Sequence, residues 1–380
     1  MTSMNRNLLL KLFPAFSIIA TLGTLIGFAV DRVSGRAISN FQFFKQGLMP
    51  DGIHYEVRTL RFLGKVDSEI LTSIGAQYKH TGLVVTEYFL SPDSWEAALV
   101  DPRILFPLLS IIFVKLFGLT GFFVVPMSCF ALLSLSPLYF NKKFLGNRQK
   151  TLAFGLVLLL VGSFYAKFNI LANTTDGLSA FLLVLLVLLI LKNYHDDENR
   201  WDQFSIPLTC LLGCMTRQNE IYIAGLVLIF YFNKRRQNIK VARLIALNSV
   251  ILTSIWFLYS YISYNNYAII TDSNGNSLGG ASLITDALGL IIKLPQILAI
   301  ESFQLLIRDV GVFAILLIAL SLIFPLKKIT ITQQMFLWVM FSGILLTSVN
   351  GSFGSGFRYA MPCIYLATFS LMEFWSESNE

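Results

Sequence analysis

The residues best suited to chemistry lie in and beside the longest hydrophilic stretch of the chain, 31–103. Asp51 stands in the run Pro50-Asp51-Gly52-Ile53-His54-Tyr55. An ionised carboxylate there can act as a general base toward a hydroxyl group within about 3 Å. A second carboxylate, Asp176, opens an apolar stretch further along the chain. Both positions also suit an ordinary role, because acidic residues are favoured at the start of a helix. Asp51 would cap a helix predicted from Gly52 to Leu63, which Gly64 ends.

Long apolar helices must position these carboxylates. Of the 380 residues, 55% are hydrophobic and 13% are charged, whereas soluble domains carry about 25% charged residues. The mean hydropathy is +0.66, and many apolar runs approach the roughly 20 residues that a helix needs to cross a bilayer. The sequence therefore predicts an all-α polytopic membrane protein that forms one membrane-embedded domain over residues 1–380.

The basic connectors set the orientation, because short loops rich in Lys and Arg stay in the cytoplasm. They lie at 141–150, 192–200, 233–243 and 327–328. This pattern explains the net charge of +7 without a nucleic-acid partner. With the connectors and both termini inside, we expect about ten transmembrane helices. The predicted spans are 8–30, 120–140, 151–168, 177–192, 205–217, 219–233, 243–263, 309–326, 333–350 and 359–375.

Two further apolar segments are not counted as crossings. Segment 104–118 precedes the second span almost without a break, and counting it would move the basic connectors outside. Segment 283–307 is interrupted by a proline and by charged residues. We predict interfacial or re-entrant segments on the outer side for both. The outer face then carries one large first loop, 31–103, which we expect to contain interfacial helices, and both Asp51 and Asp176 lie on that face.

Four basic residues break the charge pattern, because each lies near the outer end of a predicted span. Cations at this boundary can bind a phosphate or diphosphate group, which arginine does through two parallel hydrogen bonds. Alternatively, they extend to the membrane surface or pair with one of the acidic residues Glu220, Glu301 and Asp309. The four residues are Lys167, Arg217, Arg308 and Arg358.

The outer loop also contains histidines and several further acidic residues. No spacing among them matches a known metal-ligand motif, so the sequence predicts no metal site and places most of them on a solvated face. A requirement for a divalent metal stays open. His54 and Tyr55, beside Asp51, and Tyr359, beside Arg358, are additional candidates for the site.

Four ordered pieces of the chain resemble the GT-C superfamily of membrane glycosyltransferases, especially the protein-mannosyltransferase and aminoarabinose-transferase type. Asp51, with a tyrosine four residues later, is similar to the loop motif of that family. Asp101–Pro107 looks like its juxtamembrane stretch, and Asn173–Asp176 resembles its second acidic position. Gly356–Pro362 resembles its Arg-Tyr-x-x-Pro motif. The family often has a second acid directly after the first, where this chain has Gly52.

The resemblance implies a hexosyl or pentosyl transferase that moves a sugar from a polyprenyl-phosphate carrier to a glycan, lipid or protein acceptor. It implies that Asp51 is the general base and that Asp176 supports the site. Arg217, Arg308 and Arg358 would hold the donor phosphate, whose negative charge belongs to the leaving group. One carboxylate base with inversion at the anomeric carbon is implied. We expect a bacterial inner membrane in the cell envelope, with the active site facing outward.

Three alternatives stay open. A polysaccharide polymerase or ligase would use a diphosphate-linked oligosaccharide, but its large outer loop usually lies later in the chain. A transporter for a lipid-linked sugar would carry charges or broken helices near the middle of the membrane, whereas the charges here gather at the outer ends. A structural subunit of a membrane complex would tolerate the loss of Asp51.

Overall fold

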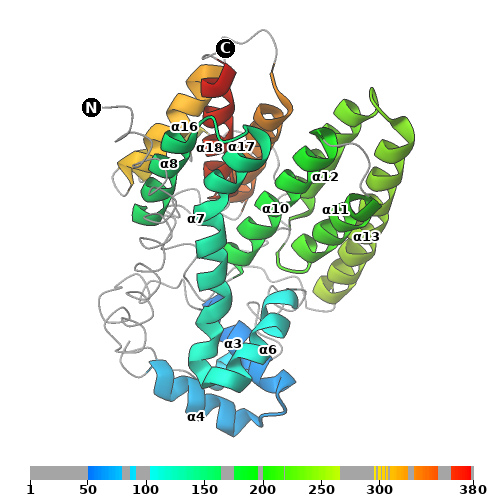
Figure 1. The fold of residues 1–380 in the computed structure, drawn as a ribbon. Coiled ribbons are helices and arrows are strands. Elements are labelled where there is room, and N and C mark those ends of the chain that lie inside the picture. Colours follow the sequence, from blue (N-terminus) through cyan, green and yellow to red (C-terminus); the bar gives the residue numbers. More distant parts are fainter. Residues whose placement is uncertain are drawn as a thin grey trace.

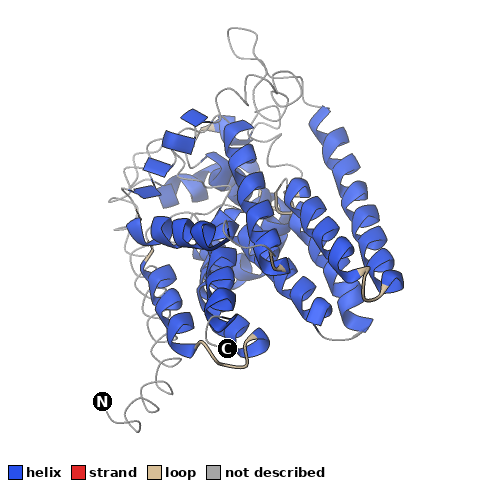
Figure 2. Ribbon diagram, turned by 90° about the horizontal axis from the view of Figure 1, so that it is seen from above, coloured by secondary structure: helices blue, strands red, loops and turns tan. Residues whose placement is uncertain are grey.

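The computed structural model contains helices and no strand in the part of the chain that it describes (Figure 2). An all-α fold was predicted, and the helices confirm it. The described residues are 50–78, 86–90, 103–163, 175–195, 200–217, 219–265, 309–323, 329–349 and 361–377, with short pieces between 295 and 306.

Helices lie at nine of the predicted spans, while the first, 8–30, is outside the described residues. Among the described residues, three helical stretches are long and apolar enough to cross a membrane: Leu105–Phe144, Asp176–His195 and Ile239–Ser260. Four shorter apolar helices accompany them. The nine helices are α7 (Val124–Phe144), α8 (Lys150–Gly162), α10 (Asp176–His195), α11 (Arg200–Cys214), α12 (Glu220–Lys234), α13 (Ile239–Asn265), α16 (Val310–Ile323), α17 (Ile331–Val349) and α18 (Met361–Glu377).

Helix α10 lies at the centre of the bundle. It packs against α7, α11, α12, α17 and α18, and Figure 1 shows it between the α11–α13 group and the group formed by α8, α16, α17 and α18. Most residues of α10 are buried, as expected for a helix that is apolar on all sides. Its first residue, Asp176, therefore lies where several helix ends meet.

A smaller helical unit lies at one end of the bundle (Figure 1). It contains α3 (Pro50–Phe62), α4 (Asp67–Tyr78), the 3₁₀ helix η3 (Glu87–Leu90) and α6 (Leu105–Phe117). Apolar side chains of α3, α4 and α6 form a core of their own, separate from that of the bundle. The outer loop was predicted to carry helices, and this unit places the loop helix α3 directly against α6.

Helix α3 follows the sequence prediction closely. A helix from Gly52 to Leu63 was predicted to end at Gly64, and the chain leaves the helix there with φ of +78° at that glycine. A positive φ is favourable only for glycine. The prediction that Asp51 is the N-cap residue of this helix is wrong, because α3 begins at Pro50 and Asp51 lies within its first turn. Proline suits the first helical position, and the helix dipole favours an acid after it.

Helix α6 is separated from α7 by the 3₁₀ helix η4 (Gly118–Phe123). Its 13 residues extend about 20 Å, which is less than the roughly 30 Å of a hydrocarbon core. A Cβ atom on Gly121 would lie 2.2 Å from the backbone oxygen of Phe113, so only glycine allows η4 to pack directly against α6. The apolar stretch Leu105–Phe144 is therefore bent into two helices rather than one rod.

Candidate functional site

Tyr55 lies at the centre of a polar cluster at the starts of α6 and α10. Its side chain is buried, and its hydroxyl oxygen accepts a hydrogen bond from Nη1 of Arg103 at 3.1 Å. A second hydrogen bond joins the hydroxyls of Tyr55 and Thr175, whose oxygens are 3.3 Å apart. The ring packs edge-on against Phe106, with 5.6 Å between centroids. Tyr55 therefore joins α3 to two other elements through both polar and aromatic contacts.

Asp51 lies in α3 one turn before Tyr55, and Tyr55 and Thr59, four residues apart, share one face of the helix. Thr59 lies one turn further along the same face. Its hydroxyl donates to the backbone oxygen of Tyr55 at 2.9 Å and lies 3.4 Å from that of Pro107. These contacts hold this face of α3 against α6. The side chain of Asp51 itself is outside the described part of the structure.

The acidic residues and histidines of the outer loop do not all lie on a solvated face. Asp67, Glu69 and Glu87 are exposed as predicted, but His54 is 4% exposed and Glu56 is fully buried. Both buried side chains interact with surrounding groups. They were missed because α3 has neighbours on more than one side, which its local sequence does not show. Within the described ranges, no three His, Cys, Asp or Glu side chains come together as metal ligands would.

Asp176 and Arg217 form an ion pair beside Thr175. Asp176 is the first residue of α10, as predicted, and Arg217 lies in the turn between α11 and α12. Their side chains are 2% and 9% exposed, so the pair is buried, and each charge compensates the other in a medium of low dielectric constant. The partner of Arg217 is not among those suggested from the sequence, which were Glu220, Glu301 and Asp309.

The turn between α11 and α12 is fixed by hydrogen bonds to its neighbours. The side-chain amide of Asn219 donates to the backbone oxygen of Gly213 at 3.0 Å, and the hydroxyl of Ser179 on α10 donates to Oδ1 of Asn219 at 3.0 Å. The backbone nitrogen of Leu105 donates to the oxygen of Met215 at 3.2 Å. The starts of α6, α10 and α12 are therefore held in one rigid arrangement.

Arg103 and Glu220 belong to this cluster, although no role at the site was predicted for them. Arg103 is 8% exposed and donates to the hydroxyl of Tyr55, and Glu220 directly follows Asn219 at the start of α12. A signal was present in the sequence, because Arg103 directly precedes an apolar helix on the predicted outer side. It breaks the charge pattern in the same way as the four basic candidates.

Several predicted site residues cannot be placed relative to the cluster. One of them is Arg308, whose neighbour Asp309 is described. Asp309 caps α16, because its Oδ1 accepts a hydrogen bond from the backbone nitrogen of Val312 at 3.1 Å. Its Oδ2 accepts from the hydroxyl of Ser163 at 2.5 Å. The candidates outside the described residues are Lys167, Arg308, Arg358 and Tyr359.

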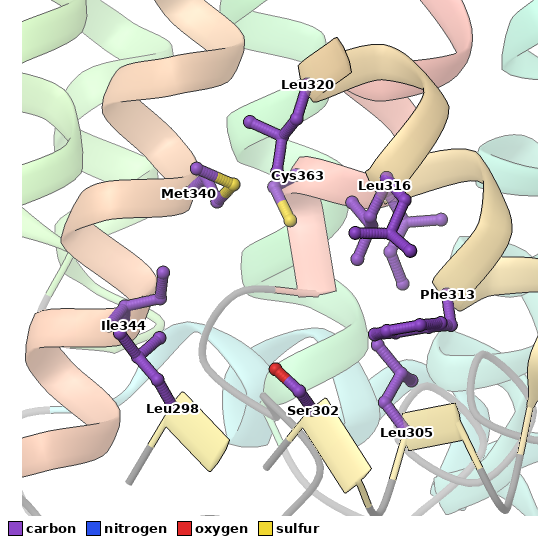
Figure 3. Close-up of a pocket in the computed structure, with 11 residues that line it drawn as sticks. Leu298, Ser302, Leu305, Phe313, Leu316, Leu320, Met340, Ile344 and Cys363 are labelled. Atoms are coloured by element: carbon purple, nitrogen blue, oxygen red, sulfur yellow. The ribbon is translucent and has the colours of Figure 1, made fainter. Parts of the chain in front are cut away.

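The cavities lined by described helices include a groove and a smaller cavity. One is a groove of about 450 Å³ between α12 and α13, with Glu220 in its lining. The other, of about 290 Å³, is formed by α16, α17, α18 and the pieces around Leu298 and Leu305. Figure 3 shows the side chains of Phe313 and Met340 around this second cavity, and none of its described lining residues is charged. The groove reaches Glu220, next to Asn219 of the polar cluster.

No protein-family model matches the chain, and no curated protein or solved structure is significantly similar to it. A proposal of function therefore rests on the residues of this chain and on their arrangement.

Proposed function

We propose that the chain is a membrane glycosyltransferase of the GT-C type, which transfers a hexosyl or pentosyl group from a polyprenyl-phosphate carrier to an acceptor hydroxyl. The hydroxyl of Tyr55 carries the proposal, because it contacts both Arg103 and Thr175. These three residues come from three of the four pieces that resemble the family. Arg103 and Thr175 lie 48 and 120 residues after Tyr55 in the chain, so the contact between these distant pieces supports a common site.

In the proposed reaction Asp51 accepts the proton of the acceptor hydroxyl, which must approach its carboxylate to about 3 Å. The acceptor oxygen then attacks the anomeric carbon, and the bond from that carbon to the phosphate oxygen breaks. Polyprenyl phosphate leaves with the electron pair, and the anomeric centre is inverted. The position of Asp51 in α3, one turn before Tyr55, supports this role.

Positive charge at the leaving phosphate lowers the barrier, because negative charge develops there. We assign this role to Arg308 and Arg358, as the resemblance implies, with Arg103 as a further cation close to the site. The burial of Arg217 against Asp176 favours a different role for that residue. We propose that the pair holds Thr175 in place, so that it positions Tyr55 and the helix that carries the base.

The proposal includes about ten crossings with both termini in the cytoplasm of a bacterium, and a site that faces outward from the inner membrane. In this topology the starts of α6, α10 and α12 and the turn before α12 all lie on the outer side. The charges of the cluster come from these ends and not from the middle of a helix. This distribution favours a site at the outer boundary over the pathway of a transporter.

Replacing the proposed base tests this function directly. We expect Asp51→Asn to lower transfer from a labelled polyprenyl-phosphate sugar by at least about 100-fold, while the protein still enters the membrane and elutes as one species in detergent. Asp67→Asn is the matched control, because this acid of the neighbouring helix is exposed. Full activity of Asp51→Asn would exclude the carboxylate as the base. No transfer by the unaltered protein from any carrier-linked sugar would contradict the whole class.

A further inference from the structure

The groove between α12 and α13 runs along the bundle from the polar cluster. Helix α12 lines it from Glu220 to Tyr231, and α13 lines it from Ala246 to Phe257. The eleven-residue step along α12 corresponds to about 16 Å of helix. The volume of about 450 Å³ falls within the range of roughly 300–1,000 Å³ that is usual for ligand sites. The groove is therefore long and narrow enough for a single extended chain.

The surface of the groove is apolar. Leu228, Val250 and Phe257 line it, and each exposes more than half of its side chain. The hydroxyl of Thr253 donates to the backbone oxygen of Ser249 on its own helix at 2.8 Å, so its hydrogen atom is already used within α13. Because α13 is one of the helices long and apolar enough to cross a membrane, the groove is accessible to a hydrocarbon chain from the bilayer.

One end of the groove is polar and meets the candidate site. Glu220 is the first residue of α12 and directly follows Asn219, whose side chain is hydrogen-bonded to Ser179 on α10 and to the backbone of Gly213. A lipid lying in the groove would thus bring its headgroup to this cluster. The described residues that line the cavity among α16, α17 and α18 include no charged side chain (Figure 3).

We infer that the groove between α12 and α13 binds the isoprenoid chain of the carrier, with the phosphate end beyond Glu220 and toward Arg103 and Tyr55. The inference rests on the proposed function for the identity of the lipid. It adds where the chain lies and which of the two cavities is used. Apolar burial along the groove would supply binding energy, while the charged groups at its end would fix the orientation.

A photoreactive probe tests this placement without any sugar transfer. The full-length protein is reconstituted in vesicles of phosphatidylethanolamine and phosphatidylglycerol with a long-chain prenyl phosphate that carries a diazirine in its chain. We expect labelled peptides from α12 and α13. Ala224 lines the groove and is exposed in it, so Ala224→Trp should fill the space and reduce labelling by about tenfold or more, a change of about 1.4 kcal/mol in binding.

Control variants separate filling of the groove from general damage. Ile255→Trp adds the same side chain to α13 at a residue that is 59% exposed and does not line the groove, and labelling should stay unchanged. Ala246→Trp fills the groove from the opposite helix and should reproduce the loss seen with Ala224→Trp. Labelling concentrated on α16–α18, or equal labelling in all variants, would overturn the inference.

The outcomes distinguish this inference from the function on which it rests. Labelling of the groove by the prenyl phosphate, without transfer from any carrier-linked sugar, would keep the lipid site and reject the glycosyltransferase. Transfer that depends on Asp51, with no labelling of α12 or α13, would keep the enzyme and reject the groove.

Discussion

Removing one member of the buried ion pair between Asp176 and Arg217 should destabilise the protein far more than removing one member of an ion pair on its surface. Both side chains are at least nine-tenths buried, so a single neutralisation leaves the other charge without compensation in a medium of low dielectric constant. We expect Asp176→Asn and Arg217→Gln each to lower the free energy of unfolding by about 3–5 kcal/mol. The double variant should lose no more than either single variant, which gives a coupling energy of about 3 kcal/mol.

The surface pair of Arg61 and Asp67 supplies the comparison. Its side chains are 40% and 56% exposed, with 3.1 Å between nitrogen and oxygen, and its coupling energy should be about 0–1 kcal/mol. Unfolding would be followed by tryptophan fluorescence in mixed micelles with a rising fraction of denaturing detergent. A coupling energy for Asp176 and Arg217 no larger than that of the surface pair would refute the role of the buried pair in holding the cluster together.

Two further substitutions examine packing at the site and in the bundle. Tyr55→Phe removes a hydroxyl with two hydrogen-bond partners, so we expect lower transfer activity and a loss of about 1–3 kcal/mol in the free energy of unfolding. Tyr139→Phe, at an exposed tyrosine, should change neither quantity. Equal effects of the two substitutions would contradict the hydrogen bonds of Tyr55 with Arg103 and Thr175. A Cβ on Gly225 would lie 1.9 Å from the ring of Trp338, so Gly225→Ala should destabilise by about 1–3 kcal/mol. Gly155→Ala, in a helix with open space around it, should be neutral or slightly stabilising. Thermal unfolding in detergent measures both variants. A lower unfolding temperature for Gly155→Ala than for Gly225→Ala would contradict the packing of Gly225 against Trp338.

The helices were predictable from the sequence because each depends on a local property. Long apolar runs predicted the helices of the bundle. Gly64 predicted the end of α3, because glycine tolerates the positive φ that the chain adopts there. The start of α10 at Asp176 was also predicted, since an acidic residue before an apolar run is a common start of a helix. Local sequence therefore predicts both the helices and the presence of two carboxylates near helix starts.

The contacts between the pieces of the site were not predictable in the same way. The partner of Arg217 was missed because several acidic residues are expected on the same face of the membrane, and sequence does not rank them by distance. Burial of Glu56 depends on neighbours of α3 that are far away in the chain. No role was predicted for Arg103, because it lies at the end of the outer loop and not at the end of a predicted span.

The hydrogen bond between Tyr55 and Thr175 has a consequence for biosynthesis, because its partners are 120 residues apart. At roughly 5–20 residues per second, the ribosome needs about 6–24 s to add this length. Helix α3 must persist for that time without its partner, and its own small core with α4 and α6 can protect it meanwhile. The contact can close only after α10 and the turn that carries Arg217 have been made, so the polar cluster forms after more than half of the 380 residues have been synthesised.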